Sequence, residues 1–247
     1  MLHPLLNPCT PLERKNRKLY YKFLLFDLDH TLLDFEAAEE AALTEMLLEV
    51  GVEDVEAYKD YYKPMNQQLW RDLEAKKITK TELVKTRFAL LFDHFDHQVD
   101  GEAMAMLYEK HLGQQGQTYL GAHELLEDLI AAGYEIYGAT NGITAIQEGR
   151  MARSSISPLF KHIFISEQSG TAKPDAAYYD WIGANIEGFN KEKALMIGDS
   201  LTADIRGGHN AGIDTIWYNP KKQVNNSGLE PNYTVYDYNG IRKILLA

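Results

Sequence analysis

The 247-residue sequence has one cysteine, Cys9, and no long hydrophobic run. A single cysteine excludes an intrachain disulfide, so we expect a reducing compartment, the cytoplasm. No stretch approaches the roughly 18 consecutive apolar residues that a membrane-spanning helix needs. The sequence therefore predicts a cytoplasmic protein without a membrane partner.

Basic residues are also few. The chain has 25 Lys and Arg against 36 Asp and Glu, a formal net charge of -11. A surface that binds a nucleic-acid polymer is normally basic, so we expect no such partner, although a single nucleotide is not excluded as a ligand. If the ligand is an anion, a metal ion and nearby lysines must offset the negative field of the protein.

The first 20 residues show no sign of a function. They contain three prolines, and a basic cluster at 14–18 follows a weakly apolar part. A secretory signal has the reverse order, with its positive charge before an unbroken apolar region. We expect residues 1–20 to form a poorly ordered extension.

A long helical block follows the first predicted strand. Helix-forming residues at helical spacing predict helices at 36–50, 54–76, 79–95 and 101–113. Thr79 and Asp100 are the predicted N-terminal caps of the last two. Parallel strands are normally joined through one helix, so residues 34–118 are predicted to be an inserted, all-helical subdomain.

Strand and helix patterns alternate in the remaining core, residues 21–33 and 119–247. The apolar run after Lys22 predicts the first strand, and later strands are predicted at 134–139, 161–165, 194–197, 213–218 and 233–236. Helical patterns separate them at 124–132, 143–152, 175–187 and 202–211, and a last helix is predicted from 239. The alternation predicts an α/β fold with a doubly wound, Rossmann-like parallel sheet.

We expect the chemistry where the first strand ends, in Phe26-Asp27-Leu28-Asp29-His30-Thr31. Ligands of open parallel sheets bind beyond the carboxyl ends of the strands. Two carboxylates this close repel each other unless they share a proton or a divalent cation. With a cation, one acid can act as a nucleophile while the other moves protons. The alternative interpretation is that both acids only cap a turn.

Polar residues also follow two later strands. Thr140 and Asn141 offer a hydroxyl, an amide and backbone N–H groups to an anion, or they simply cap the next helix. Lys173 precedes Pro174, and it can supply a fixed positive charge to a phosphate. The alternative for Lys173 is an ordinary surface lysine.

A further acid, Asp199, follows the strand predicted at 194–197, and Asp204 comes five residues later. Asp204 suits the helix dipole with or without a chemical role. Asp199 is harder to explain structurally, because an acid beside other acids is unfavourable without a cation. Asp27, Asp29 and Asp199 together offer oxygen ligands suited to Mg²⁺.

FDLDHT, ATNG, the lysine of TAKPD and GDSLTAD, in this order, resemble the motifs of the haloacid dehalogenase superfamily of phosphotransferases. The resemblance implies that Asp27 is the nucleophile, which becomes an aspartyl-phosphate, and that Asp29 is the general acid and base. It also implies that Lys173 stabilises the charge shared by the nucleophile and the phosphate. The phosphoryl group would be bound by Thr140 and Asn141.

The same resemblance implies Mg²⁺ as the cofactor. The ion would be held by Asp27, Asp199 and the backbone carbonyl of Asp29. Thr31, Ser200 and Asp204 would support the surrounding loops. Because dehalogenases lack the second acid of the first motif, Asp29 indicates phosphate esters rather than carbon–halogen bonds as substrates.

The helical block at 34–118 resembles a C1-type cap, which closes over the site and excludes water. FDLDHTLLDFEAAEE, with ATNG and GDSLTADIRGG, is similar to the bacterial pyrimidine 5′-nucleotidases, which hydrolyse nucleoside monophosphates such as dUMP, UMP and dTMP. The resemblance therefore predicts a Mg²⁺-dependent phosphatase for a small phosphomonoester, a nucleoside 5′-monophosphate.

Several cap side chains could stack on or bond a base: Phe35, Tyr61, Tyr62, Asn66, Trp70 and Arg71. Large apolar residues at helical spacing equally indicate the packed core of the cap. Two other functions stay open, a phosphoglycolate-type or sugar-phosphate phosphatase or phosphomutase, and a binding module without turnover. The oligomeric state is left as a monomer or a homodimer.

Overall fold

The computed structural model describes residues 20–74 and 77–246. Apart from Tyr20, the predicted N-terminal extension lies outside the described residues. The chain divides into two compact units. Among the described residues, the core unit contains 20–34, 118–144 and 155–246, and the helical unit contains 35–74, 77–117 and 145–154.

The core unit is built on a parallel sheet. Within the described residues six strands pair in the order β3-β2-β1-β4-β5-β6, and the predicted doubly wound parallel sheet is thereby confirmed. Their bounds are β1 (Phe23–Phe26), β2 (Glu135–Thr140), β3 (His162–Ile165), β4 (Ala194–Gly198), β5 (Asp214–Tyr218) and β6 (Tyr233–Val235). Phe26 of β1 is aligned with Gly138 of β2 and Ile197 of β4, so three strands end near one edge of the sheet.

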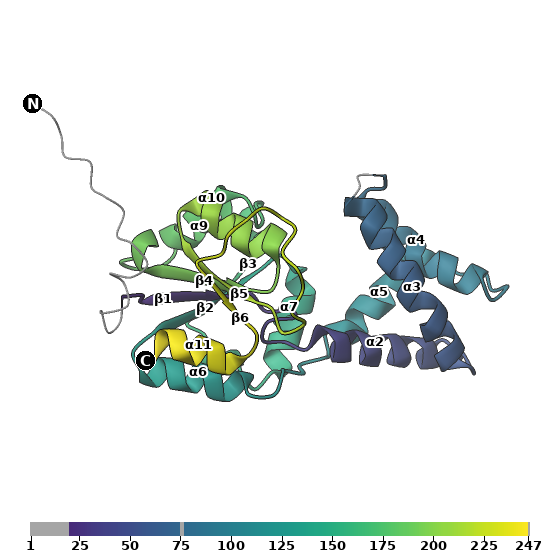
Figure 1. Ribbon diagram of the computed structural model, residues 1–247. Helices are drawn as coiled ribbons and strands as arrows, with labels where there is room; N and C mark the ends of the chain where they lie inside the picture. The colour runs from purple at the N-terminus through teal and green to yellow at the C-terminus, as the bar shows by residue number, and fades with distance from the viewer. Residues whose placement is uncertain (1–19, 75–76, 247) are drawn as a thin grey trace, which may run out of the picture. The chain divides into compact units, whose positions relative to one another are not determined.

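Helices cover both faces of this sheet (Figure 1). Helices α6 (Ala122–Ala131) and α11 (Tyr238–Leu245) lie on one face, and α9 (Ala176–Ala184) and α10 (Arg206–Ala211) on the other. Because both faces are covered, β1 is buried along its whole length, and its sequence is an unbroken apolar run. The short helix α8 (Ser166–Ser169) was not predicted from the sequence.

The helical unit has its own apolar core. It consists of α2 (Phe35–Glu49), α3 (Val55–Glu74), α4 (Lys80–Asp93), α5 (Gly101–Leu112) and most of α7 (Thr144–Arg153). The predicted caps are confirmed: the Thr79 hydroxyl accepts the amide of Glu82, and Asp100 accepts the amides of Glu102 and Ala103. A capped start stabilises such a helix by about 1 kcal/mol.

Residues 145–154 differ from the sequence prediction, which placed them with the core. In the structure Ile146 packs against the core of the helical unit, and Arg150 Nε donates a hydrogen bond to the carbonyl of Gln115 at 3.2 Å. The helical unit is therefore assembled from two separate stretches of the chain.

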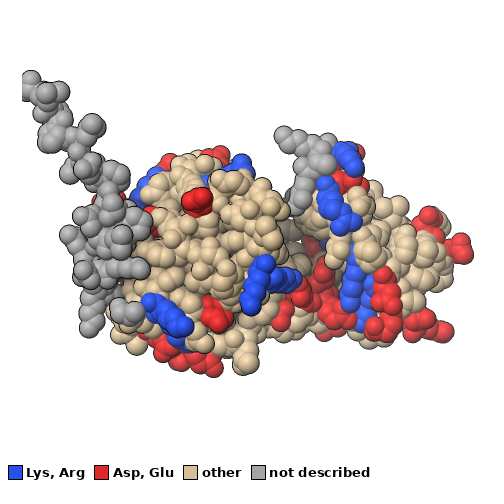
Figure 2. Space-filling model, viewed as in Figure 1, with Lys and Arg blue, Asp and Glu red and all other residues tan. Residues whose placement is uncertain are grey.

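The surface agrees with the acidic composition. On the face shown in Figure 2, Lys and Arg are dispersed among Asp and Glu rather than gathered into one basic surface. No helix within the described residues is both long and apolar enough to cross a membrane.

Candidate active site

The loop after β1 holds the first pair of acids. The amide of Asp27 donates to the carbonyl of Ile197 at 2.9 Å, which continues the pairing of β1 with β4. The carbonyl of Leu28 then accepts the amides of Thr31, Leu32 and Leu33, so the chain turns tightly beyond the strand. His30 has a positive φ of 62° within this turn. The local fold therefore fixes Asp27 at the strand end and Asp29 in the turn.

Asp27 is buried and bonded through both of its carboxylate oxygens. Its Oδ1 accepts a hydrogen bond from Lys173 Nζ at 2.6 Å, and its Oδ2 accepts one from the hydroxyl of Thr31 at 3.3 Å. Burial raises the pKa of Asp27 well above its ordinary value, although the Lys173 cation acts in the opposite direction. A buried carboxylate of this kind needs positive charge beside it to stay ionised.

Lys173 is buried rather than an ordinary surface lysine. Its Nζ pairs with Asp27 at 2.6 Å and with Asp204 at 2.8 Å, and it donates to the carbonyl of Ala139 at 2.6 Å. Burial disfavours the charge of the ammonium, but Asp204 and Asp27 hold the pKa of Lys173 well above its ordinary value. Lys173 therefore supplies a positive charge where β1, β2 and β4 end.

Asn141 holds the backbone of Lys173. Its side-chain Nδ2 donates to the carbonyl of Lys173 at 2.8 Å, and its Oδ1 accepts the amide of Lys173 at 2.9 Å. In the structure the amide oxygen and nitrogen of Asn141 both bond the lysine backbone, and the predicted contact of Asn141 with the phosphate stays a prediction. This contact joins two loops 32 residues apart, and no local pattern in the sequence indicates it.

Thr140 lies beside this contact at the end of β2 and is buried. Its Oγ1 accepts the amide of Gly142 at 3.0 Å, which is the local capping that the sequence left open. Its predicted role in binding the phosphoryl group stays a prediction.

The loop after β4 brings Asp199, Ser200 and Asp204 to the same edge. Asp204 Oδ2 accepts the amide of Ser200 at 2.9 Å, and Ser200 Oγ accepts the amide of Ala203 at 3.1 Å. A Cβ on Gly198 would lie 2.2 Å from Asp204 Oδ2, so only glycine leaves room for this contact. Trp217 Nε1 of β5 donates to the carbonyl of Asp199 at 2.8 Å, a contact that the sequence does not predict.

Three of these acids form a group that could hold a metal ion. Asp27, Asp199 and Asp204 each present a carboxylate oxygen, and these oxygens lie within 4.8 Å of one another. Burial, together with the charge of Asp204, raises the pKa of Asp199 to about 7. Three acids face one lysine, so a divalent cation would offset the remaining negative charge, and hard oxygen donors of this kind fit Mg²⁺.

Asp29 is not part of this group of carboxylates among the described residues. It is half-buried and pairs with Leu33 through its backbone. Its predicted part as a metal ligand through the backbone carbonyl stays a prediction.

The six side chains predicted to contact a base have different surroundings in the helical unit. Tyr62 is buried and stacks on Phe88, which agrees with the core alternative. Tyr61 is half-buried and stacks on His94 with ring centroids 3.6 Å apart. Phe35 is half-buried below the guanidinium of Arg150, and Asn66 is buried. Trp70 is 41% exposed, and Arg71 is exposed as well.

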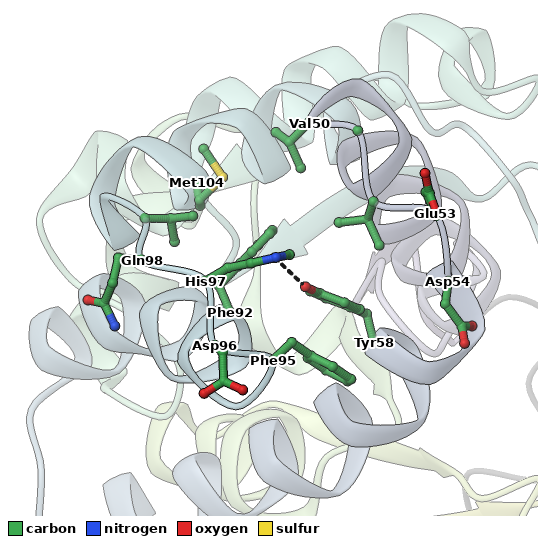
Figure 3. A pocket seen from close by; sticks show the side chains of 13 residues that line it. Val50, Glu53, Asp54, Tyr58, Phe92, Phe95, Asp96, His97, Gln98 and Met104 are labelled. Carbon is green, nitrogen blue, oxygen red and sulfur yellow. Dashed lines mark hydrogen bonds between the residues drawn. The ribbon is translucent and has the colours of Figure 1, made fainter.

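The helical unit also contains a pocket between the loops that precede α3 and follow α4 (Figure 3). The hydroxyl of Tyr58 is hydrogen-bonded to Nδ1 of His97 at 2.8 Å, and the ring of Tyr58 stacks on Phe95. None of the residues predicted for the site from the sequence lines this pocket. The candidate active site is therefore the cluster at the strand ends of the core unit.

The fold and this cluster define the class of the protein. The chain belongs to the haloacid dehalogenase-like hydrolases, since a sequence profile of that family matches residues 24–218. The family predicted from the four motifs is thereby confirmed, and the protein is a hydrolase.

Individual relatives are similar over nearly the whole chain. Pyrimidine 5′-nucleotidase PynA of Streptococcus pneumoniae is 62% identical over 89% of this chain and 93% of its own. Pyrimidine 5′-nucleotidase YjjG of Escherichia coli is 28% identical over 91% of this chain and 98% of its own. A crystal structure of the HAD-hydrolase YfnB of Bacillus subtilis bound to magnesium has a TM-score of 0.85 and 38% identity, and the match covers 92% of this chain and 99% of that one.

Proposed function

We propose that the protein is a Mg²⁺-dependent phosphatase that hydrolyses pyrimidine nucleoside 5′-monophosphates through an aspartyl-phosphate on Asp27. The observation that carries the mechanism is the buried Lys173 cation, which bridges Asp27 and Asp204 at the strand ends. The substrate class rests on similarity to PynA and YjjG, both named as pyrimidine 5′-nucleotidases. Cytoplasmic action as a monomer or homodimer is part of the proposal.

Asp27 acts as the nucleophile in the first half of the reaction. A carboxylate oxygen forms a bond to phosphorus, and the bond between phosphorus and the ester oxygen breaks. Asp29 gives its proton to the leaving alcohol as this bond breaks. Lys173 stabilises the negative charge that Asp27 and the phosphoryl group share, and Thr140 donates its hydroxyl proton to a phosphoryl oxygen.

Water completes the reaction. Asp29 now takes a proton from the attacking water, whose oxygen bonds to phosphorus, and the bond from phosphorus to Asp27 breaks. Free phosphate leaves, and Asp27 and Asp29 return to their starting states. When bound, Mg²⁺ would be held by Asp27 and Asp199, supported by Asp204, and would neutralise charge on the phosphate. The helical unit serves as the cap subdomain, whose task is to exclude water during the reaction.

Replacing Asp27 by Asn tests this mechanism. The amide cannot form the aspartyl-phosphate, so we expect phosphate release from UMP to fall by at least about a thousandfold. Phosphate release is measured with Mg²⁺ and with a chelator, over a panel of nucleotides, sugar phosphates and phosphoglycolate. Wild-type-like turnover in Asp27→Asn contradicts the mechanism.

The panel separates the alternatives. Metal-dependent release that is fastest from pyrimidine monophosphates supports the whole proposal. If phosphate is released fastest from a sugar phosphate or from phosphoglycolate, the mechanism is kept and the proposed substrate class is overturned. If no phosphate is released from any compound of the panel, the protein is a binding module without turnover.

A further inference from the structure

The C-terminal helix α11 is bonded to the rest of the core unit through tyrosine hydroxyls at both of its ends. At its start, the hydroxyl of Tyr238 donates to the carbonyl of Thr31 at 2.7 Å, although the two residues are 207 positions apart in the chain. At its end, the carbonyl of Leu245 accepts the hydroxyl of Tyr134 at 2.6 Å. Tyr238 is 7% exposed and Tyr134 is 5% exposed. The two bonds are of the same kind, but only the first reaches a loop of the candidate active site.

The donor of that first bond is held in place. The ring of Tyr238 stacks on the ring of Tyr218 in β5, with centroids 5.2 Å apart and an angle of 12° between the planes. Burial raises the pKa of Tyr238, so its hydroxyl keeps the proton that it donates. Asp237 caps the start of α11 by accepting the amide of Gly240 at 2.8 Å. A fixed ring on a capped helix thus presents one hydroxyl to the carbonyl of Thr31.

The acceptor belongs to the turn that carries Asp29. His30, between Asp29 and Thr31, has a φ of 62°, a left-handed conformation that is unfavourable for a residue with a side chain. Such a conformation persists only where the surrounding structure holds it. Thr31 is held on two sides, because its hydroxyl donates to Asp27 Oδ2 at 3.3 Å while its carbonyl accepts from Tyr238. The hydroxyl of Tyr238 therefore supports the turn directly after Asp29.

We propose that Tyr238 is a positioning residue for Asp29, through its bond to the carbonyl of Thr31. In this role it acts through the backbone of the turn and not by contact with the substrate. It fixes the direction in which the turn presents the Asp29 carboxylate to the leaving oxygen. This inference rests on the proposed function, in which Asp29 protonates the leaving alcohol, and it makes that step depend on the C-terminal helix.

The experiment compares two substrates that differ in their leaving group. UMP releases an alkoxide, which needs the proton of Asp29, whereas p-nitrophenyl phosphate releases a nitrophenolate, which departs without one. For both, kcat/KM reports the steps up to the aspartyl-phosphate, in which Asp29 gives this proton. Tyr238→Phe removes the hydroxyl and keeps the ring, so we expect kcat/KM to fall about tenfold for UMP and less than about twofold for p-nitrophenyl phosphate.

Tyr134→Phe is the matched control. It removes the same kind of bond from the other end of α11, so it should lower Tm by a similar amount. The ratio of the two kcat/KM values should nevertheless stay as in the wild type. Because both substrates are measured on one sample, this ratio does not depend on the folded fraction, and a partly unfolded variant still gives a result.

The Asp29→Asn background provides a second measurement. A positioning residue loses its effect once the group that it positions is gone. In this background, Tyr238→Phe should therefore change kcat/KM for UMP by less than about twofold. A tenfold loss there would show that Tyr238 acts on another group, and it would overturn the inference.

The remaining outcomes separate this inference from the proposed function. If Tyr238→Phe keeps the wild-type ratio, or loses kcat/KM equally for both substrates, the inference is overturned while hydrolysis of UMP still supports the proposed function. If the wild type hydrolyses another alkyl phosphate but not UMP, the proposed substrate class fails, and that ester takes the place of UMP in the test. If the wild type hydrolyses no phosphate ester, the proposed function and this inference fail together.

Discussion

At the scale of single residues, Asn141 contacts the backbone of Lys173. Both polar atoms of its side chain bond the lysine backbone, and Lys173 in turn pairs with Asp27 and Asp204. A residue that positions another loses its effect once the second residue is removed. Kinetics of the double variant can therefore distinguish whether Asn141 positions Lys173 or contacts the phosphate.

We predict that Asn141→Ala lowers kcat/KM about tenfold or more in the wild type, because the lysine loses two backbone contacts. In a Lys173→Ala background the same substitution should change kcat/KM by less than about twofold. Steady-state kinetics of the four proteins measures this coupling, with Asn225→Ala in an exposed loop as the control. A further loss in the Lys173→Ala background would show that Asn141 contacts the phosphate itself.

Asp199 has a pKa of about 7, raised by burial and by Asp204, so its protonation competes with a cation in the neutral range. Above pH 7 the carboxylate is ionised and available. As the pH falls below 7 it takes up a proton, and the Kd for Mg²⁺ should rise up to about tenfold per pH unit. Calorimetric titration of the metal-free protein between pH 5.5 and 8.5 measures this.

The matched variant Asp199→Asn should bind Mg²⁺ weakly over the same pH range and lose most of the dependence on pH. A Kd for wild type that does not change between pH 8 and pH 6 would show that Asp199 does not ligate the ion.

The grouping of Asp27, Lys173 and Asp199 could be predicted from the sequence because the carboxyl ends of parallel strands meet at one edge of a sheet. The partners that orient these three side chains could not be predicted. The bonds from Asn141 to Lys173 and from Trp217 to Asp199 depend on loops that approach each other only in the folded chain. Asn66 was a candidate for the base, but its contact with Glu39 was not visible in the pattern.

At the scale of elements, the helix after β4 departs from the prediction. One helix was expected at 202–211, whereas residues 201–205 form a wider π-helical turn before α10. The amide of Ile205 bonds the carbonyl of Ser200, and Asp204 bonds the amide of Ser200. The turn is widened where the carboxylate of Asp204 reaches back toward the strand end, and hydrophobic periodicity carries no information about this.

Gly198→Ala tests this close approach. A methyl group there would lie 2.2 Å from Asp204 Oδ2, so Asp204 must move and lose its contacts with Ser200 and Lys173. We predict a loss in kcat/KM of about a hundredfold and a fall in stability of about 1–3 kcal/mol, measured by kinetics and urea denaturation.

The control for this substitution is Gly138→Ala in β2, whose added methyl would have side-chain atoms of Ile163 as its nearest neighbours, the first at 3.1 Å. It should cost much less activity. Equal losses at the two positions would show that the space beside Asp204 has no special importance.

At the scale of the whole molecule, the acidic site of the core unit links metal binding to folding. Asp27, Asp199 and Asp204 repel one another without a cation, and a ligand that binds only the folded state stabilises it. At a Mg²⁺ concentration of 100 times Kd, we predict about 2.7 kcal/mol of added stability and a rise in Tm. Thermal unfolding with and without Mg²⁺ measures the shift.

Asp199→Asn should reduce the rise in Tm, and the charge-neutral control Asn225→Gln should not. An equal rise in wild type and Asp199→Asn would place the bound Mg²⁺ elsewhere on this acidic protein.

The place of β1 in the sheet has a consequence for synthesis on the ribosome. This strand is the first within the described residues, but its neighbours β2 and β4 begin at residues 135 and 194. Synthesis adds about 5–20 residues per second, so β4 is made on the order of ten seconds or more after β1. The nascent chain thus leaves both edges of a fully buried strand unpaired during much of translation, and unpaired strand edges of this kind favour aggregation.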